Sequence, residues 1–319
     1  MPHVVIAGKI HEAGLEVFKA AKGFTFEQVL DVTLAAYAPL MPKADAVLLR
    51  TQPLQAELIA QSPNLKIVSR HGVGYDAVDV AALNARKIAL AIVGDVNSRA
   101  VAEHTMSLML AAARRVVAHD QASRNGNWNM RNAFDSVELD GKRLLVIGFG
   151  RIGRRVAELA RAFGMSIAAH DPYLDETTIR AAGAEPAQDL KSALPQADYV
   201  SLHMPGAKGA IIGAAELTLM KLTAIVVNAA RGGLVDEQAL DAALRARKLY
   251  AAALDVLVEE PPKPDHPLLS NPHITISPHN AGLTQECARR MAISAAQNIV
   301  DYFAGKIDPK LVVNNASLT

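Results

Sequence analysis

Short apolar runs alternate with longer segments of helical periodicity, and this alternation occurs twice along the chain. Apolar runs that are separated by helices indicate parallel strands whose two faces are both covered. Two such series predict two α/β domains, each a doubly wound parallel sheet, Rossmann-like or flavodoxin-like, with a cleft between them. The first series of expected strands is 4–7, 46–50, 66–70 and 88–93, and the second is 144–148, 166–170, 199–203, 224–229, 251–257 and 274–277.

Two helical segments set the expected domain boundaries. The segment "SRAVAEHTMSLMLAAARRVVAHDQA" between the two series predicts one long, largely buried helix over residues 99–120, with Ser98 as its N-cap. The pattern "TQECARRMAISAAQNIVDYFAG" after the last strand predicts a helix that ends at Gly305 and returns to the first domain. One domain is therefore expected to comprise residues 1–98 with 283–319, and the other residues 99–282.

Composition narrows the classes of function. The net charge of +1 argues against a nucleic-acid partner, and no apolar run reaches the roughly 20 residues of a membrane span. The ten histidines fit no metal-ligand spacing, so no metal site is expected. The single cysteine, Cys287, and an N-terminus that enters a strand at once predict a cytoplasmic protein.

The strongest local motif is "LLVIGFGRIGRRVAELARAFG", in which Gly148, Gly150 and Gly153 form G-x-G-x-x-G between an apolar strand and a helix. That context is what a dinucleotide pyrophosphate requires: a tight turn, close backbone approach and a helix N-terminus. Asp171 ends the next strand, where a carboxylate accepts hydrogen bonds from the ribose hydroxyls and repels a 2′-phosphate. We therefore expect NAD as cofactor. The alternative is a structural glycine turn with a capping aspartate.

Four further residues follow later strands of the second series, where open α/β sheets bind ligands. Arg231 follows "IVVNAA", Asp255 and Glu260 lie in and after "AAALDVLVEEPP", and His279 ends "ITISPH". Taken singly, Arg231 can be a surface ion pair, Glu260 a solvated acid and His279 a local cap. Together, an arginine, an acid and a histidine at the strand ends of one cofactor-binding sheet favour a catalytic site over three separate structural roles.

These motifs, in this order and spacing, resemble those of the D-isomer-specific 2-hydroxyacid dehydrogenase family. The resemblance also takes in "HGVGYDAVDVAAL" and "VAEHTMSLMLAAARR", so it runs from about residue 47 to residue 302. It implies that residues 99–282 bind NAD and that the other domain binds substrate. By this resemblance the cofactor contacts also include Arg151, Ile152, His203, Pro205, Ala229 and Asp255, the last near the nicotinamide amide.

The resemblance also implies roles in catalysis. Arg231 is expected to clamp the substrate carboxylate, His279 to be the general acid in reduction, and Glu260 to orient His279 and raise its pKa. In the first domain, Val73 and Gly74 match the loop whose backbone N–H groups hold the substrate carboxylate. Arg50 is expected to face the same cleft.

The resemblance leaves the substrate open. Reduction of hydroxypyruvate or glyoxylate is the first expectation, because no regulatory domain is appended and the pocket is expected to be small. A short-form 3-phosphoglycerate dehydrogenase is the alternative, in which Arg50, Arg70 and His71 offer partners for a phosphate. An NAD(H)-sensing corepressor is a third, less favoured class. Family members commonly pair through the long helix, so a homodimer is expected.

Overall fold

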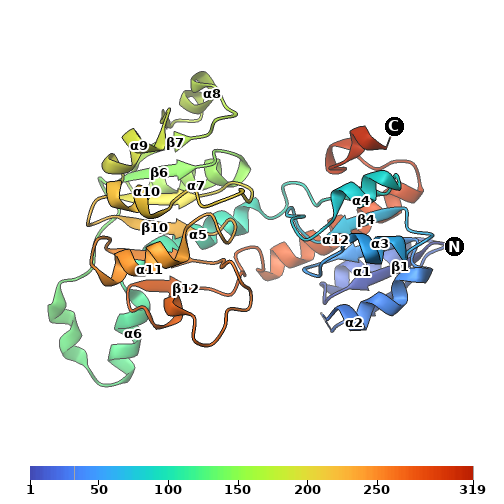
Figure 1. The fold of residues 1–319 in the computed structure, drawn as a ribbon, viewed down its shortest axis with the longest axis horizontal. Helices are drawn as coiled ribbons and strands as arrows, with labels where there is room; N and C mark the ends of the chain where they lie inside the picture. The colour runs from blue at the N-terminus through green and yellow to red at the C-terminus, as the bar shows by residue number, and fades with distance from the viewer. Residues whose placement is uncertain (32, 319) are drawn as a thin grey trace. The chain divides into compact units, whose positions relative to one another are not determined.

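The computed structural model describes residues 1–31 and 33–318. It divides into two units, Met1–Asn97 with Leu283–Thr319 (unit 1) and Ser98–Gly282 (unit 2). Each unit is a wholly parallel sheet with helices on both faces (Figure 1). The predicted fold class, two doubly wound α/β domains, is confirmed.

Unit 1 has the strand order β2-β1-β3-β4-β5, which is the flavodoxin-like order. Its strands are apolar on both faces of the sheet, so a layer of helices covers each face and shields it from water. Helices α1 and α12 pack on each other at one face, and α2, α3 and α4 contribute to the core on the other. The strands are β1 (His3–Ala7), β2 (Thr25–Val29), β3 (Ala46–Leu49), β4 (Ile67–Arg70) and β5 (Ala89–Ala91). The helices are α1 (Glu12–Ala20), α2 (Leu34–Tyr37), α3 (Ala56–Ala60), α4 (Val80–Ala85) and α12 (Gln285–Phe303).

Unit 2 has the order β12-β11-β10-β9-β6-β7-β8, a Rossmann-like order whose direction of winding reverses between β6 and β9. Its strands are β6 (Arg143–Ile147), β7 (Ser166–His170), β8 (Glu185–Pro186), β9 (Tyr199–Leu202), β10 (Ile225–Asn228), β11 (Ala251–Leu254) and β12 (Ile274–Ile276). Its helices are α5 (Ser98–Ala113), α6 (Val116–Arg124), α7 (Arg151–Ala162), α8 (Glu176–Ala181), α9 (Leu190–Ala193), α10 (Ala214–Leu219) and α11 (Glu237–Arg245). Short 3-10 helices are η1 (Ala38–Lys43), η2 (Trp128–Ala133), η3 (Leu194–Gln196), η4 (Pro267–Ser270), η5 (Pro309–Leu311) and η6 (Asn315–Ser317).

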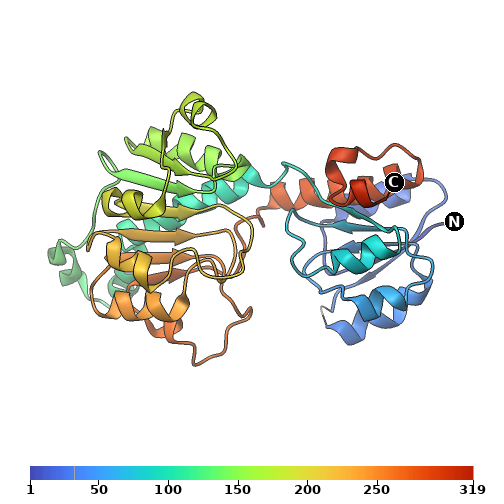
Figure 2. The same cartoon turned by 45° about the horizontal axis from the view of Figure 1, so that its top comes forward.

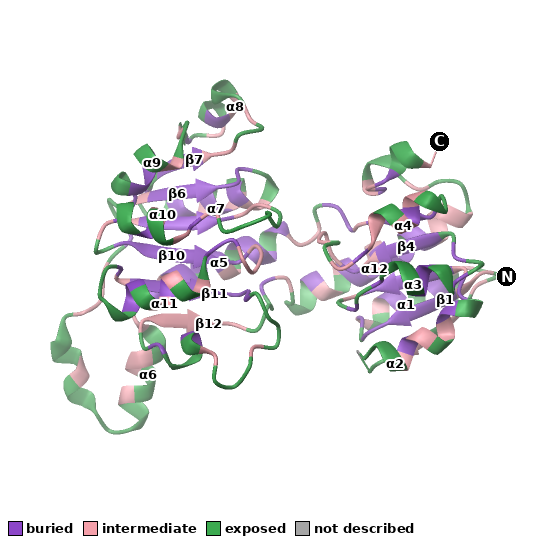
Figure 3. Ribbon diagram, viewed as in Figure 1, coloured by how far each residue is buried: buried purple, intermediate pink, exposed green. Residues whose placement is uncertain are grey.

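Two apolar layers enclose the seven-stranded sheet. Helices α5 and α7 pack side by side against one face, and α9, α10 and α11 cover the other (Figures 1 and 2). The central strands are buried along their whole length, whereas the outward faces of the helices are exposed (Figure 3). The carboxyl ends of the strands carry most of the residues singled out above.

The prediction of one helix over residues 99–120 is wrong in one respect. The chain forms α5 and α6, separated at Arg115, whose φ of +50° is left-handed. The turn lets the Arg115 guanidinium reach Asp135 at 2.5 Å. It also releases α6 from the sheet, so that Val116 and Val117 are about half exposed. A continuous helical pattern in the sequence therefore hides a break that is held by a distant carboxylate.

Two edge strands were not predicted, and several predicted strands are shorter in the structure, above all β5, which covers Ala89–Ala91 and not 88–93, and β11. Strand β2 is only partly buried, so its sequence "TFEQV" lacks an apolar run, and β8 has two residues. Strand β11 ends at Leu254 and not at Leu257, because the next residue, Asp255, turns its carboxylate to the chain after β12. Among the described residues, no helix is long and apolar enough to cross a membrane.

Candidate active site

The predicted cofactor and catalytic residues of unit 2 all lie at the carboxyl edge of its sheet. Each follows the end of a strand by a few residues: Gly148, Gly150, Arg151, Ile152 and Gly153 after β6, Asp171 after β7, His203 and Pro205 after β9, Ala229 and Arg231 after β10, Asp255 and Glu260 after β11, and His279 after β12. Because all seven strands are parallel, residues from distant parts of the chain share one edge.

The glycine loop fits a dinucleotide pyrophosphate. Gly148 has a φ of +88°, and a Cβ on Gly153 would lie 2.2 Å from the carbonyl oxygen of Gly148, so both positions require glycine. Gly150 differs, since a Cβ there meets no atom within 4 Å. It caps the twelve-residue helix α7 and leaves open space before the free N–H groups of its first turn. That space and those donors suit a phosphate anion.

Asp171 is held beside this loop. Its carboxylate accepts hydrogen bonds from the backbone N–H of Phe149 at 2.9 Å and from that of Tyr173 at 3.0 Å. A carboxylate has about four acceptor positions, so it retains capacity for ribose hydroxyls. Its role in NAD binding stays a prediction.

His203 and Pro205 follow the neighbouring strand β9. The Nε2 of His203 lies 2.8 Å from the Ser201 hydroxyl, while Nδ1 is buried without a hydrogen-bond partner among the described residues. Burial lowers the pKa of His203 to about 3, so its ring is neutral near pH 7. Pro205 lies exposed in the loop that follows.

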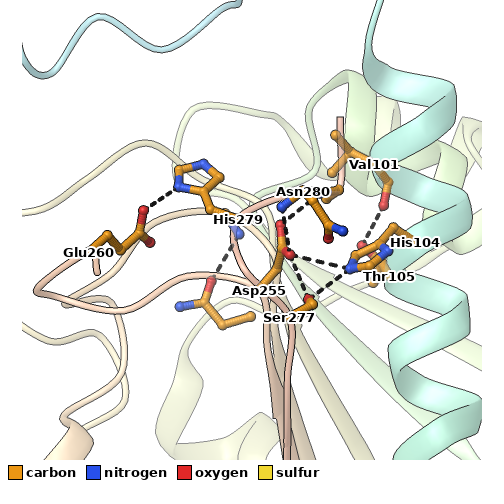
Figure 4. A network of polar contacts seen from close by, with 11 residues as sticks. Val101, His104, Thr105, Asp255, Glu260, Ser277, His279 and Asn280 are labelled. Carbon is orange, nitrogen blue, oxygen red and sulfur yellow. Dashed lines mark hydrogen bonds and ion pairs between the residues drawn. The ribbon is translucent and has the colours of Figure 1, made fainter. Parts of the chain in front are cut away.

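Glu260 and His279 form the most direct pair of the site (Figure 4). One carboxylate oxygen of Glu260 accepts a hydrogen bond from the Leu257 backbone N–H at 2.9 Å, and the other lies 2.6 Å from Nδ1 of His279. The carboxylate is therefore fixed by its own loop before it meets the ring. This arrangement places the ring proton on Nδ1 and leaves Nε2 for a substrate.

The pair shifts both ionisations in the direction that favours an ion pair. The hydrogen bond that His279 donates to Glu260 raises the pKa of His279 above its ordinary value, against a partial loss of hydration and the nearby charge of Arg231. Burial opposes the ionisation of Glu260, but the hydrogen bonds from His279 and the Leu257 backbone prevail and lower its pKa. The site thus keeps a protonated imidazole available to higher pH.

Arg231 is positioned by the turn in which it lies. Asn228, at the end of β10, donates from its amide to the carbonyl of Arg231 at 2.8 Å and accepts from the Ala230 N–H at 3.0 Å. A Cβ on Gly232 would lie 2.0 Å from the carbonyl oxygen of Leu257, so this glycine lets the turn pack on the loop that carries Glu260. The Arg231 guanidinium donates through Nη1 to the Ala230 carbonyl at 2.7 Å, and its charge acts to lower the pKa of His279.

In unit 1, Arg50, Val73 and Gly74 lie after β3 and β4. The Arg70 side chain organises this loop: its Nε donates to the Gly74 carbonyl at 2.8 Å, and its Nη1 donates to the carbonyls of Leu49, at 3.1 Å, and Arg50. Neighbouring His71 is buried, and its ring nitrogens have no partner among the described residues. Burial, aided by the charges of Arg50 and Arg70, lowers the pKa of His71 to about 4.

Three residues with a clear place at this edge were not predicted: His104, Ser277 and Asn228. His104 lies in the apolar helix α5, and its Nε2 is 2.9 Å from the Ser277 hydroxyl (Figure 4). A lone histidine in an apolar helix carries no local signal of its partner. Across residues 1–31 and 33–318, no group of three or more His, Cys, Asp or Glu side chains is arranged to hold a metal ion.

Comparison with known proteins identifies the family. Residues 106–281 match the family model described as "D-isomer specific 2-hydroxyacid dehydrogenase, NAD binding domain". The chain belongs to the D-isomer specific 2-hydroxyacid dehydrogenase family and carries its NAD-binding domain. The resemblance and the cofactor class predicted from the sequence are confirmed.

The relatives include two named activities. A glyoxylate reductase of Aeropyrum pernix is 39% identical over 98% of this chain and 96% of its own length. A D-3-phosphoglycerate dehydrogenase of Methanocaldococcus jannaschii is 36% identical over 98% of this chain, which spans 59% of that relative's length. Among solved structures, an NADPH-dependent glyoxylate/hydroxypyruvate reductase of Sinorhizobium meliloti is similar with a TM-score of 0.87 and 28% identity, over 99% of this chain and 98% of that one.

The glycine loop generates a test that separates folding from cofactor binding. Gly153→Ala forces a methyl group against a backbone carbonyl, so we expect a loss of about 1–3 kcal/mol in the free energy of unfolding. Gly150→Ala adds the same methyl group in open space, so stability should fall less, by the preference for glycine over alanine at an N-cap alone, while NADH binds more weakly. Urea unfolding and NADH fluorescence titration measure the two effects.

Gly209→Ala is the matched control, because a Cβ there also meets nothing within 4 Å and the residue lies in an exposed loop. It should change neither quantity. An unchanged affinity for NADH in Gly150→Ala would contradict the assignment of this loop to the pyrophosphate.

Proposed function

We propose that the protein reduces a small, unphosphorylated 2-oxoacid to its D-2-hydroxyacid with NADH, with glyoxylate or hydroxypyruvate as substrate. The observation that carries the proposal is the 2.6 Å contact between Glu260 and Nδ1 of His279, within the electrostatic reach of Arg231. An acid, an imidazole and a guanidinium are the groups needed to bind an anionic oxoacid and protonate its ketone.

His279 is the proton donor in this proposal. The protonated ring, stabilised through Nδ1 by Glu260, gives the proton on Nε2 to the C2 oxygen of the substrate. NADH, held by the glycine loop and Asp171, would supply the hydride for C2. The neutral ring then regains a proton from solvent, which its half-exposed position allows. In the oxidative direction, the neutral ring accepts the hydroxyl proton.

Arg231 holds the substrate carboxylate and polarises the ketone. A guanidinium presents planar pairs of N–H donors that match a carboxylate, and the rigid turn at Asn228 and Gly232 fixes its approach. Following the family resemblance, we assign the backbone N–H groups of Val73 and Gly74 to the same carboxylate, and Arg50 to substrate binding. Ala229, Arg151 and Ile152 are assigned to the cofactor, and Asp255 to the nicotinamide amide.

The unit 1 loop favours a substrate without a phosphate. His71 is neutral near pH 7, because the pKa of its buried ring is about 4. Arg70 directs its guanidinium to backbone carbonyls of the loop. Of the three residues proposed for a phosphate, Arg50 is then the main cation. The 36% identity to a D-3-phosphoglycerate dehydrogenase keeps 3-phosphohydroxypyruvate as the second candidate.

NADH oxidation tests the proposal directly. The purified protein is assayed with NADH and with NADPH against glyoxylate, hydroxypyruvate, 3-phosphohydroxypyruvate and a branched 2-oxoacid. We expect the highest kcat/KM with NADH and one of the first two acids, since the Asp171 carboxylate repels a 2′-phosphate. His279→Ala should lower kcat at least about 10²-fold and retain NADH binding.

A preference for 3-phosphohydroxypyruvate would transfer the assignment to the second candidate. A preference for NADPH would show that Asp171 does not select the cofactor. A His279→Ala enzyme with most of its activity would remove the proton-transfer assignment.

The Glu260–His279 pair also predicts a pH dependence. Reduction requires protonated His279, so the rate is present below the pKa of that ring and is lost as pH rises through it. Glu260→Gln removes the anion that raises this pKa. The alkaline limb of kcat/KM for reduction should therefore move to lower pH, with little change in NADH affinity. The same limb at unchanged pH would contradict the role given to Glu260.

We also propose that two copies of the chain pair through α5, α6 and the segment after them. Trp128 and Phe134 of this segment are 70% and 89% exposed. The same unit has an apolar hollow of about 450 Å³ along α5 and α7, lined by Glu103, Met106, Ser107, Leu110, Ala111, Val116, Leu159 and Phe163. In a two-fold pair, each contact between the copies occurs twice. The projecting apolar side chains of one copy can therefore enter the apolar hollow of the other copy, and the reverse.

Sedimentation velocity tests this pairing. The wild-type chain should sediment as a dimer, and Trp128→Ser with Phe134→Ser should sediment as a monomer at the same concentration, because the apolar cover is lost. Phe163→Ser, which removes apolar surface from the hollow, should weaken the dimer as well. A monomeric wild-type chain would contradict the proposal.

A further inference from the structure

The carboxylate of Asp255 is the most enclosed charge of unit 2's carboxyl edge. The residue is 1% exposed, and its carboxylate accepts hydrogen bonds from the Ser277 hydroxyl at 2.6 Å, the Asn280 N–H at 3.0 Å and the Ala281 N–H at 2.9 Å. Nε2 of His104 lies 3.3 Å from the same carboxylate (Figure 4). Burial opposes ionisation of Asp255, but these hydrogen bonds prevail and lower its pKa.

This carboxylate shapes the segment that carries the proposed proton donor. His279 has a left-handed φ of +50°, which non-glycine residues seldom adopt. Its N–H donates to the Asp255 carbonyl at 2.8 Å, and the next two N–H groups donate to the Asp255 carboxylate. Three consecutive backbone donors thus converge on one residue, and they hold the conformation that points the His279 ring toward Glu260 (Figure 4).

A chain of hydrogen bonds connects the Asp255 carboxylate to His104 in α5, and the donor of each bond can be assigned. Asp255 is ionised and can only accept, so the Ser277 hydroxyl donates its single hydrogen to it. The Ser277 oxygen then has only lone pairs to offer at 2.9 Å from His104, so Nε2 of His104 carries a hydrogen and donates it. His104 therefore donates a hydrogen bond to the Ser277 hydroxyl, and the same N–H lies beside the Asp255 carboxylate.

We propose that His104 is a positioning residue for the reaction: through Ser277 and Asp255 it fixes the backbone of residues 279–281 and thereby the aim of the His279 ring. The proposal rests on the proposed function, since it takes His279 as the proton donor. His104 acts through other residues and is not assigned any contact with substrate or cofactor.

The place of His104 in the chain gives this role a further consequence. Unit 2 begins at Ser98 and ends at Gly282, so the chain passes between the units directly before α5 and directly after Gly282. His104 lies two turns into α5, and Ala281 lies one residue before the second passage. Within unit 2, the residues next to both connecting segments therefore contact the Asp255 carboxylate, which also fixes the backbone at His279.

The test compares His104→Leu, which removes the donor, with His104→Gln, which can still donate from its amide. We expect His104→Leu to lower kcat roughly tenfold, the effect of losing one hydrogen bond to a charged group, with smaller changes in KM and in NADH affinity. His104→Gln should recover most of the rate. Ser277→Ala removes the same link from the other side and should reproduce the loss, and the double variant should lose no more than either single one.

A second readout does not need turnover. Ring ¹⁵N shifts of His279, read through its carbon-bound protons and assigned with His279→Gln, report the hydrogen bond to Glu260. They should change in His104→Leu and return in His104→Gln. The matched control is His119→Leu, which removes a contact of the same type, Nε2 to Asp135 at 3.1 Å on α6. It should change neither the rate nor the His279 shifts.

Unchanged kcat and unchanged His279 shifts in His104→Leu overturn the proposal. A loss of rate that His119→Leu reproduces, or that His104→Gln shares in full, also overturns it, because the effect is then one of general stability. If the wild-type protein reduces no 2-oxoacid while the His279 shifts still respond to His104→Leu, the proposed function fails and the positioning role stands.

Discussion

The buried charge of Asp255 constrains the functional edge of unit 2. Taking an ion out of water costs several kcal/mol even after relaxation, so such a group persists only where donors surround it. The donors here come from the segment that follows β12 and from α5, and they can meet the carboxylate only in one arrangement of the chain. The need to solvate one carboxylate therefore fixes the end of β11, the left-handed backbone of His279 and the first turns of α5 together.

Strand order explains how the other functional groups arrive at the same place. Strands β10, β11 and β12 are neighbours in the sheet, and Arg231, Glu260 and His279 follow them in that order. Parallel pairing puts all three carboxyl ends on one edge, so a separation of many residues in sequence becomes contact between adjacent loops. Gly232 completes the approach, because any side chain there would collide with the Leu257 carbonyl.

The sequence predicted those features whose physical cause is local or periodic. Buried parallel strands appear as apolar runs, and the glycine loop appears as fixed spacing, so the two sheets and the cofactor edge of unit 2 could be expected. Strand β2 could not, because a partly exposed edge strand needs no apolar run. The break at Arg115 and the partnership of His104 depend on Asp135 and Ser277, which lie 20 and 173 residues away. No pattern along the chain encodes such contacts.

Two carboxylates of this edge perform different tasks because their surroundings differ. Asp255 is closed off from water and surrounded by donors, so its charge is constant and serves to fix the backbone. The Glu260 side chain is 35% exposed and faces a single imidazole nitrogen, so its charge acts on the ionisation of that ring. His279 stands between the two, since its N–H binds the Asp255 carbonyl and its ring binds Glu260. The position of the proposed proton donor and its proton affinity are thus set by separate residues, and either can change while the other is kept.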